Sequence, residues 1–128
     1  MHEPTPARLR NLANRCAPED AAEIVAIARD MERYSFARAA ELLRALDPRA
    51  TIRIGHDGLA WHASAAVNHD WLMPRLGTGE GQTVEAAVDG LLASLVRTAQ
   101  RRIAEYRREL DDDCLQAEAD TLEGMVAA

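Results

Sequence analysis

Apolar residues recur at helical spacing through the first third of the chain. Two prolines near the start predict a frayed tail over residues 1–6, and the pattern then predicts helical structure over 7–47. Within it we expect a short helix over about 7–15 and a second start at Pro18, because proline is tolerated in the first turn of a helix. The pattern leaves open whether Ser35 caps a further helix or lies inside one long helix.

The spacing of apolar residues changes from helical to alternating after Pro48. Proline ends the helix because it displaces the residue before it from helical backbone angles. Alternation over 51–75 predicts a β-hairpin or a three-stranded meander, with turn residues at 55–58. The central strand has an apolar face formed by Leu59, Trp61, Ala63, Ala65 and Val67. Residues 71–73 are a candidate for a short third strand.

A glycine-rich segment, residues 77–82, is predicted as a loop that leads into a long amphipathic helix. Thr83 suits the N-cap of that helix, which we place at 83–110 and which would be about 42 Å long. The hairpin is too small to cover it, so the apolar stripe over 99–110 should meet the N-terminal helices or a second copy of the chain. We therefore expect a homodimer through this helix. Three aspartates then suit a new helix start, which predicts a short acidic helix over 111–123.

These elements predict one α+β domain over residues 1–128, with N-terminal helices, a small antiparallel sheet of two or three strands, a long C-terminal amphipathic helix and a short terminal helix. Aromatic residues make up only 4% of the chain, so aliphatic side chains must form the core. No stretch approaches the ~20 apolar residues of a membrane span, and no secretory signal is visible. We expect a cytoplasmic protein without a cofactor or a membrane partner, in which Cys16 and Cys114 are free, mildly buried thiols.

Charge is segregated in the last third of the chain. All 15 basic residues are arginine, and the formal net charge is −6. The candidate partner-binding residues are Arg97, Arg101, Arg102, Arg107, Arg108, Asp111, Asp112 and Asp113. Arginine is favoured at protein interfaces and in phosphate contacts, although a solvated helix face, with Arg101 paired to Glu105, is the simpler interpretation. The acidic net charge disfavours unassisted binding of nucleic acid.

Three further patterns contain residue types that occur in phosphate-binding, metal-binding or catalytic sites. The glycine-rich loop precedes a helix, as phosphate-binding loops do, but the chain has no P-loop lysine and Glu80 would repel an anion. Histidines and aspartates occur together as in metal sites, but His56 and His69 lie in turns about 25–30 Å apart. His62 and Ser64 share a strand face, yet a hydrolase built on them would need an acid and an oxyanion hole from elsewhere. We therefore predict no catalytic residue and no metal ligand.

The segment 51–95 contains a strand, a His-Asp-Gly turn, a second strand and then the run Gly81-Gln82-Thr83-Val84-Glu85-Ala86-Ala87 at a helix start. This order resembles the partial ribonuclease-H-like domain of HicB-type antitoxins. It is also similar to a double-stranded-RNA-binding domain, in which Gly-x-Gly precedes an alanine-rich last helix. Both resemblances imply a ββ(β)α topology. Neither carries over a functional residue, since the RNA-binding family has a lysine-rich triplet where this chain has residues 83–85.

The leading hypothesis from the sequence is a non-catalytic protein-interaction module. It would bind a partner through the arginine-rich helix, the acidic C-terminus or an exposed sheet edge, for example as an antitoxin-like or phage-type inhibitor of a nucleic-acid-processing complex. The first alternative is direct nucleic-acid binding through the arginines of 97–108. The second is a small hydrolase or metal-binding protein that uses His62 and Ser64 or the histidines and aspartates of the turns.

Overall fold

Helices flank a run of strands along the chain. The computed structural model describes residues 6–15, 17–70 and 74–127. Within these residues the helices are α1 (Pro6–Ala13), α2 (Pro18–Leu46), α3 (Val84–Arg108) and α4 (Asp113–Ala127), and the strands are β1 (Thr51–His56), β2 (Trp61–Ala66) and β3 (Gly77–Gly81). The predicted α+β class is confirmed. Residues 1–5 of the predicted tail, the candidate strand at 71–73 and Cys16 lie outside the described residues. The prediction that the tail includes residue 6 is wrong, because α1 begins at Pro6.

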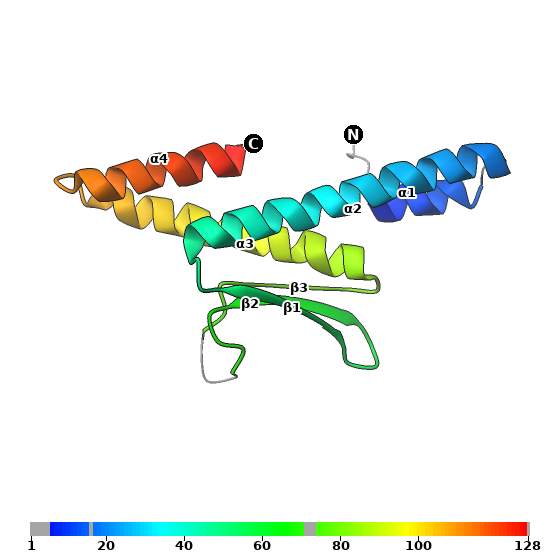
Figure 1. Cartoon of the computed structure of the whole chain (residues 1–128), viewed down its shortest axis with the longest axis horizontal. Helices are drawn as coiled ribbons and strands as arrows, with labels where there is room; N and C mark the ends of the chain where they lie inside the picture. The colour runs from blue at the N-terminus through cyan, green and yellow to red at the C-terminus, as the bar shows by residue number, and fades with distance from the viewer. Residues whose placement is uncertain (1–5, 16, 71–73, 128) are drawn as a thin grey trace.

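The helices form a layer on one face of the sheet (Figure 1). Helix α3 lies against β2 and β3, and α2 crosses over α3. Helix α1 runs along the first half of α2, and α4 folds back along the last part of α3, so the two helix pairs extend past opposite ends of the sheet. No described helix covers the other face of the sheet, which we call the open face. None of the described helices combines the length and apolar character needed to cross a membrane.

Helix α2 is continuous from Pro18 to Leu46, so Ser35 lies inside one long helix. It begins with a proline and two acids, which suit the first turn and the positive end of the helix dipole. The predicted stop before Pro48 is confirmed, because Asp47 has left the helix and is extended. Helix α1 ends slightly before the predicted boundary.

The sheet is an antiparallel meander in the order β1-β2-β3. One row across the three strands consists of Arg53, Ser64 and Thr78, and a neighbouring row consists of Ile54, Ala63 and Gly79. Successive residues of a strand point to opposite faces. The row that contains Ala63, a buried residue of the core, therefore faces the helices, and the row that contains Arg53 lies on the open face.

The predicted apolar face of the central strand is confirmed for Trp61, Ala63 and Ala65. Both alanines are buried, and Trp61 packs against the core. The prediction is wrong for Leu59 and Val67, which are 84% and 40% exposed. Both residues lie beyond the ends of β2, so the alternation of the strand does not hold them against the helices.

The glycine-rich segment forms β3, so its prediction as a loop is wrong. The three glycines of Gly77–Gly81 face α3, whose backbone approaches so closely that a Cβ on Gly79 would overlap Ala87 O and Leu91 N. Gly90 allows the approach from the helix side, since a Cβ on it would lie 3.1 Å from Gly79 Cα. These glycines therefore do not provide a flexible turn. They allow a helix to pack directly on the backbone of a strand.

The core between sheet and helices is built from small and medium-sized aliphatic side chains. Its buried members are Ala39, Leu42, Leu43, Leu46, Ala63, Ala65, Ala87, Leu91, Leu95, Ala99 and Leu122. Among the described residues, Leu91 and Leu95 of α3 are the largest fully buried side chains. Helix α3 is therefore the central element on which the sheet, α2 and α4 all pack.

The second half of α3 meets other helices of the same chain. Ile103 and Tyr106 are partly buried and pack against the core, to which α2 and α4 contribute on this side. The expected contact with the N-terminal helices is present, and α4 adds a second contact by folding back along α3. Leu110 lies past the end of α3 and is 80% exposed. The homodimer stays a prediction, but the apolar stripe that motivated it, apart from Leu110, packs against other parts of the same chain.

Helices α3 and α4 are separate, so the predicted break near residue 111 is confirmed. Asp112 Oδ1 accepts a hydrogen bond from the Leu115 N–H at 3.1 Å, as an N-cap side chain does. The predicted end at residue 123 is wrong, because α4 continues to Ala127. Its last turn is apolar and packs against the core, which extends the helix beyond its acidic part.

We expect Gly79→Ala to destabilise the fold by at least about 3 kcal/mol, because the added methyl group requires α3 to move off the sheet. The matched control is Gly55→Ala in β1, where a Cβ meets no atom within 4 Å and the change should be smaller than ~0.5 kcal/mol. Urea unfolding followed by circular dichroism measures both variants. Equal stability of the two would contradict the close packing of α3 on β3.

Candidate functional site

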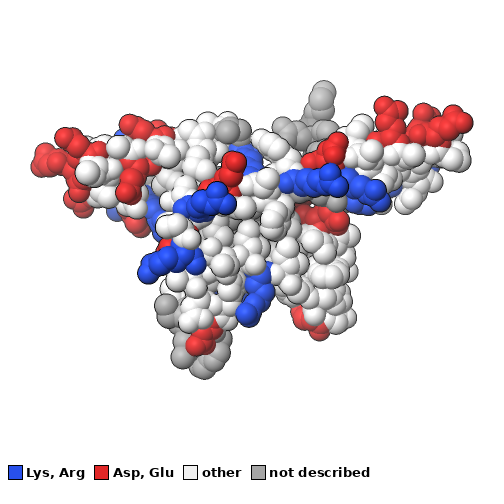
Figure 2. All heavy atoms as spheres, viewed as in Figure 1, with Lys and Arg blue, Asp and Glu red and all other residues white. Residues whose placement is uncertain are grey.

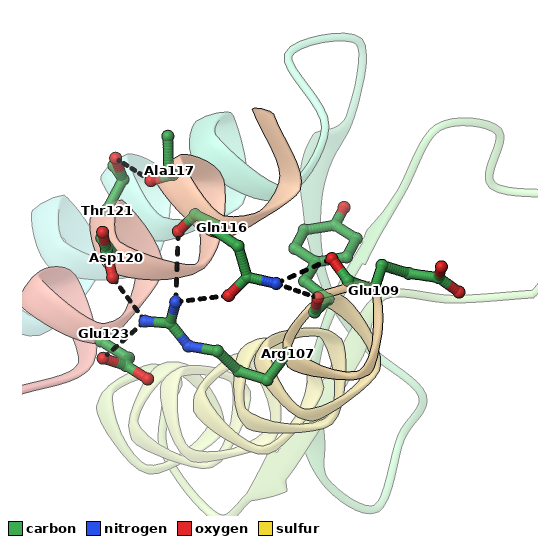
Figure 3. Close-up of polar contacts among 8 residues, drawn as sticks. Arg107, Glu109, Gln116, Ala117, Asp120, Thr121 and Glu123 are labelled. Atoms are coloured by element: carbon green, nitrogen blue, oxygen red, sulfur yellow. Dashed lines mark hydrogen bonds and ion pairs between the residues drawn. The ribbon is translucent and has the colours of Figure 1, made fainter. Parts of the chain in front are cut away.

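A polar network around Arg107 joins α3 to α4 (Figure 3). Its Nη1 donates to Gln116 Oε1 at 2.8 Å, and its Nη2 pairs with Asp120 at 2.5 Å and with Glu123 at 3.1 Å. The hydrogen bond to Asp120, followed by that to Glu123, raises the pKa of the Arg107 guanidinium. The Arg107 guanidinium is therefore occupied by contacts within the chain.

Gln116 extends this network to the end of α3. Its Nε2 donates to Tyr106 O at 2.8 Å and to Glu109 O at 3.0 Å, two carbonyls at the end of α3 that also accept the backbone N–H groups of Glu109 and Asp112. The sequence pattern did not reveal this role, because Arg107 and Gln116 meet only when α4 folds back along α3.

Arg102 is also used inside the fold. Its Nη1 donates to Leu46 O, one of the last carbonyls of α2, and so ties the end of α2 to α3. With Arg107, it is the second of the five predicted partner-binding arginines that bridges two helices. The nucleic-acid alternative therefore rests on fewer available guanidinium groups than the sequence suggested.

The other three arginines are exposed on α3. Arg101 Nη2 lies 3.3 Å from Thr98 Oγ1, and no ion pair joins it to Glu105, which the sequence had suggested as its partner. Within the described part of the chain, Arg97 and Arg108 make no hydrogen bond or ion pair through their side chains. These three guanidinium groups remain available for a partner.

The acidic members of the predicted set lie at the tip where α3 joins α4. Asp111–Asp113 are exposed there beside Arg108, whereas Arg97 and Arg101 lie further back on α3. Figure 2 shows acidic side chains gathered at both outer ends of the helix layer. The predicted residues are therefore spread over several surfaces. At the same tip Cys114 is free and exposed, so its predicted burial is wrong.

Asp57 and His62 form a pair at the hairpin end of the open face. His62 Nε2 lies 2.5 Å from Asp57 Oδ2, while Asp57 Oδ1 accepts the N–H groups of Leu59 at 2.8 Å and Ala60 at 2.9 Å. The bonds from Ala60, Leu59 and His62, in that order, hold the pKa of the Asp57 carboxyl well below its usual range. The signal for this contact is the tight turn at 58–59, which brings the residue before it close to the strand that follows.

His62 and Ser64 share a strand face as predicted, but no hydrogen bond joins them. Ser64 Oγ lies 3.4 Å from His69 Nδ1, and His69 Nε2 lies 3.1 Å from Thr51 Oγ1. The acid that the hydrolase alternative lacked is Asp57, but it pairs with one histidine while the serine pairs with another. The described residues therefore do not form the serine–histidine–acid arrangement that this alternative needs.

The third described histidine that the sequence singled out, His56, contacts Trp61. Their rings meet edge to face, with centroids 5.0 Å apart, at the hairpin end of the sheet. In the part of the chain that the structure describes, no three histidine, cysteine or acidic side chains converge on a point that could hold a metal ion.

Strand β1 is an edge strand, and no described strand pairs with its outer side. The other edge of the sheet is partly protected, because the Thr78 N–H of β3 donates to Ser94 Oγ of α3 at 3.1 Å. Five of the six residues of β1 are exposed, including Ile54 at 37%. An exposed edge strand offers its unpaired backbone groups to another strand, so β1 is the candidate for pairing.

An apolar groove runs beside the start of β1, between the strand and α2. Its volume is about 270 Å³, and it is lined by Phe36, Ala40, Leu43, Arg44, Pro48, Ala50, Thr51 and Ile52. Phe36 is the only phenylalanine in the chain, and it is 44% exposed instead of being buried in the core. Only the position of α2 beside β1 shows that Phe36 borders the edge strand.

No family model matches this chain, and comparisons with curated proteins and with solved structures find no match either.

We expect Arg107→Met to loosen α4, because it removes the contacts to Gln116, Asp120 and Glu123 together. Backbone amides of α4 should then exchange with deuterium faster, while those in the middle of α3 keep their protection. Arg108→Met is the matched control, since it removes the same charge from an exposed neighbour. If both variants leave α4 equally protected, Arg107 does not fasten the helix.

We expect the pH dependence of stability to include a contribution from Asp57. Because its folded-state pKa lies below the unfolded value, the ionised carboxylate stabilises the fold above about pH 5, and this contribution is lost as the pH falls towards the folded pKa. Asp57→Asn should lower Tm at neutral pH and shrink the fall in Tm between about pH 7 and pH 2.5. Asp111→Asn, at an exposed position, should leave both quantities near those of the parent. An unchanged pH profile for Asp57→Asn would contradict the assignment.

Proposed function

We propose that this protein is a non-catalytic protein-interaction module that binds an extended segment of a partner protein along β1. The observation that carries the proposal is the combination of an open six-residue edge strand with an apolar groove beside it. Strand addition uses these two features separately. Backbone pairing supplies affinity, and pockets for alternate side chains supply specificity.

The hairpin determines which backbone groups of β1 would receive the partner. Asp57 N–H donates to Ala60 O, so these two residues form a hydrogen-bonded pair of the ladder. Because hydrogen-bonded and non-hydrogen-bonded pairs alternate in an antiparallel ladder, the N–H and C=O groups of Ile52, Ile54 and His56 point to the open edge. An added strand can form about six backbone hydrogen bonds with them.

The groove indicates the kind of segment that would fit. Side chains on the helix-facing side of an added strand would lie beside Phe36 and Ile52, so apolar residues are favoured there. Arg44 lines the same groove and makes no ion pair among the described residues, which favours an acidic residue at one end of the segment. The partner would therefore offer an extended, alternating segment with apolar residues and one acid.

An antitoxin-like or phage-type inhibitor of a nucleic-acid-processing complex is the concrete form of this function that we favour. The meander β1-β2-β3 followed by α3 has the order of elements that the resemblance to HicB-type antitoxins implies. The net charge of −6 also suits a partner whose nucleic-acid channel is basic. Strand addition at β1 would hold the module on such a partner.

Ile54→Pro separates pairing at the edge from stability of the fold. The Ile54 N–H points to the open edge, so proline removes a donor to the partner while no bond to β2 is lost. Ile54→Thr is the matched control, because it keeps the N–H and a β-branched side chain. We expect linear peptides selected from a random library on the full chain to bind Ile54→Thr, and to bind Ile54→Pro at least about tenfold more weakly.

Two further measurements decide the outcome. Thermal unfolding should show that Ile54→Pro remains folded, and bound peptide should slow the hydrogen exchange of the amides of Ile52, Ile54 and His56. The proposal is contradicted if selected peptides bind both variants equally, or if the slowed amides lie elsewhere in the chain.

A further inference from the structure

The open face of the sheet is hollowed. The hollow has a volume of about 450 Å³ and lies between the hairpin and the segment that leads into β3. Gly55 lines the hollow without a side chain, which leaves room for a ligand next to β1. This surface is distinct from the apolar groove, which lies on the helix side of β1.

A row of hydrogen-bond donors crosses the floor of this hollow. Arg53, Ser64 and Thr78 are register partners on three adjacent strands and point to the same face. Cβ atoms of such partners are about 4.5–5.5 Å apart, so one ligand with several acceptor oxygens can reach all three side chains. Arg75 borders the same hollow from the segment before β3 and adds a second guanidinium.

Three of these four donors are not used by the fold. In the described residues, neither Arg53 nor Arg75 makes a hydrogen bond or ion pair through its side chain, and the Thr78 hydroxyl also has no partner. The Ser64 hydroxyl lies 3.4 Å from His69 Nδ1. His69 Nε2 lies 3.1 Å from the Thr51 carbonyl oxygen, which can only accept, so in the neutral ring Nε2 carries the proton and Nδ1 accepts from the Ser64 hydroxyl. Ser64 can therefore donate to a ligand only by releasing His69.

Two acids, Asp57 and Glu80, lie on the hairpin side of the donor row. Asp57 borders the hollow at the hairpin, but its oxygens already accept bonds from two backbone N–H groups and from His62. Glu80 is the register partner of His62, one row away from Thr78. These two carboxylates therefore lie between the donor row and the hairpin, and the Asp57 carboxylate is already occupied.

We propose that the row Arg53–Ser64–Thr78, together with Arg75, binds a phosphate group. The two arginine forks and the Thr78 hydroxyl that line this hollow match a tetrahedral oxyanion with several acceptor oxygens, and Ser64 can add a second hydroxyl donor by releasing His69. The phosphate belongs either to a small phosphorylated compound or to the backbone of a single-stranded nucleic acid. This site does not depend on strand addition at β1.

The test is a titration of the full chain with inorganic phosphate, followed by NMR at constant ionic strength with chloride as the reference anion. We expect saturable shifts at the amides of Arg53, Ser64 and Thr78. Arg53→Met and Arg75→Met should each weaken binding by about tenfold or more. Arg108→Met removes the same charge at the far tip of α3 and should leave binding unchanged. Arg75 lies outside the strands, so its variant keeps the test decisive if a change in β1 harms folding.

A second titration with a short single-stranded oligonucleotide distinguishes the two sources of phosphate. Tighter binding of the oligonucleotide that still depends on Arg53 and Arg75 assigns the site to a nucleic-acid backbone. Binding no tighter than that of inorganic phosphate assigns it to a small phosphorylated compound. The proposal is overturned if phosphate produces the same shifts as chloride, or if Arg108→Met weakens binding as much as Arg53→Met does.

Discussion

Close packing of α3 on β3 is the constraint on which the rest of this structure depends. A strand that carried side chains towards the helix would hold it at an ordinary helix–sheet distance. Here glycines at alternate positions of β3, and Gly90 on α3, let the two backbones approach directly. Leu91 and Leu95 of α3 can then be fully buried over a sheet whose own inward residues are mostly alanine and glycine. A core with so few aromatic residues is compatible with a stable fold because the layers lie so close together.

The position of α3 also decides which surfaces stay open. The helix covers β2 and β3 and satisfies an outer N–H of β3 through Ser94, so the edge of β3 is partly closed. Strand β1 lies furthest from α3 in the sheet order, and its outer edge and much of its surface remain exposed. The edge, the groove beside α2 and the open face are thus consequences of one asymmetric packing arrangement, and both proposed activities use surfaces that it leaves uncovered.

Charge in this chain has two different uses. Arg102 and Arg107 belong to the arginine cluster of residues 97–108, which the sequence predicted to bind a partner. In the structure they join α3 to α2 and to α4. Arg53 and Arg75 are isolated in sequence and meet only on the open face of the sheet. A cluster of arginines on one helix turns inward where carbonyls and carboxylates of neighbouring helices need donors. Scattered arginines can converge, because the register of a sheet brings distant residues into one row.

The sequence by itself determined the α+β class, the end of α2 before Pro48, the inward residues of β2, the N-cap at Thr83 and the break after α3, since each depends on local periodicity or on capping chemistry. The glycine strand could not be predicted, because glycine has no side chain to show an alternation and is common in turns. The Asp57–His62 and Ser64–His69 pairs required the register of the hairpin and the path of the following turn. The Arg107 network required α4 to fold back on α3. These features were decided by tertiary structure, because each needs contacts between residues whose spacing along the chain says nothing about their distance in space.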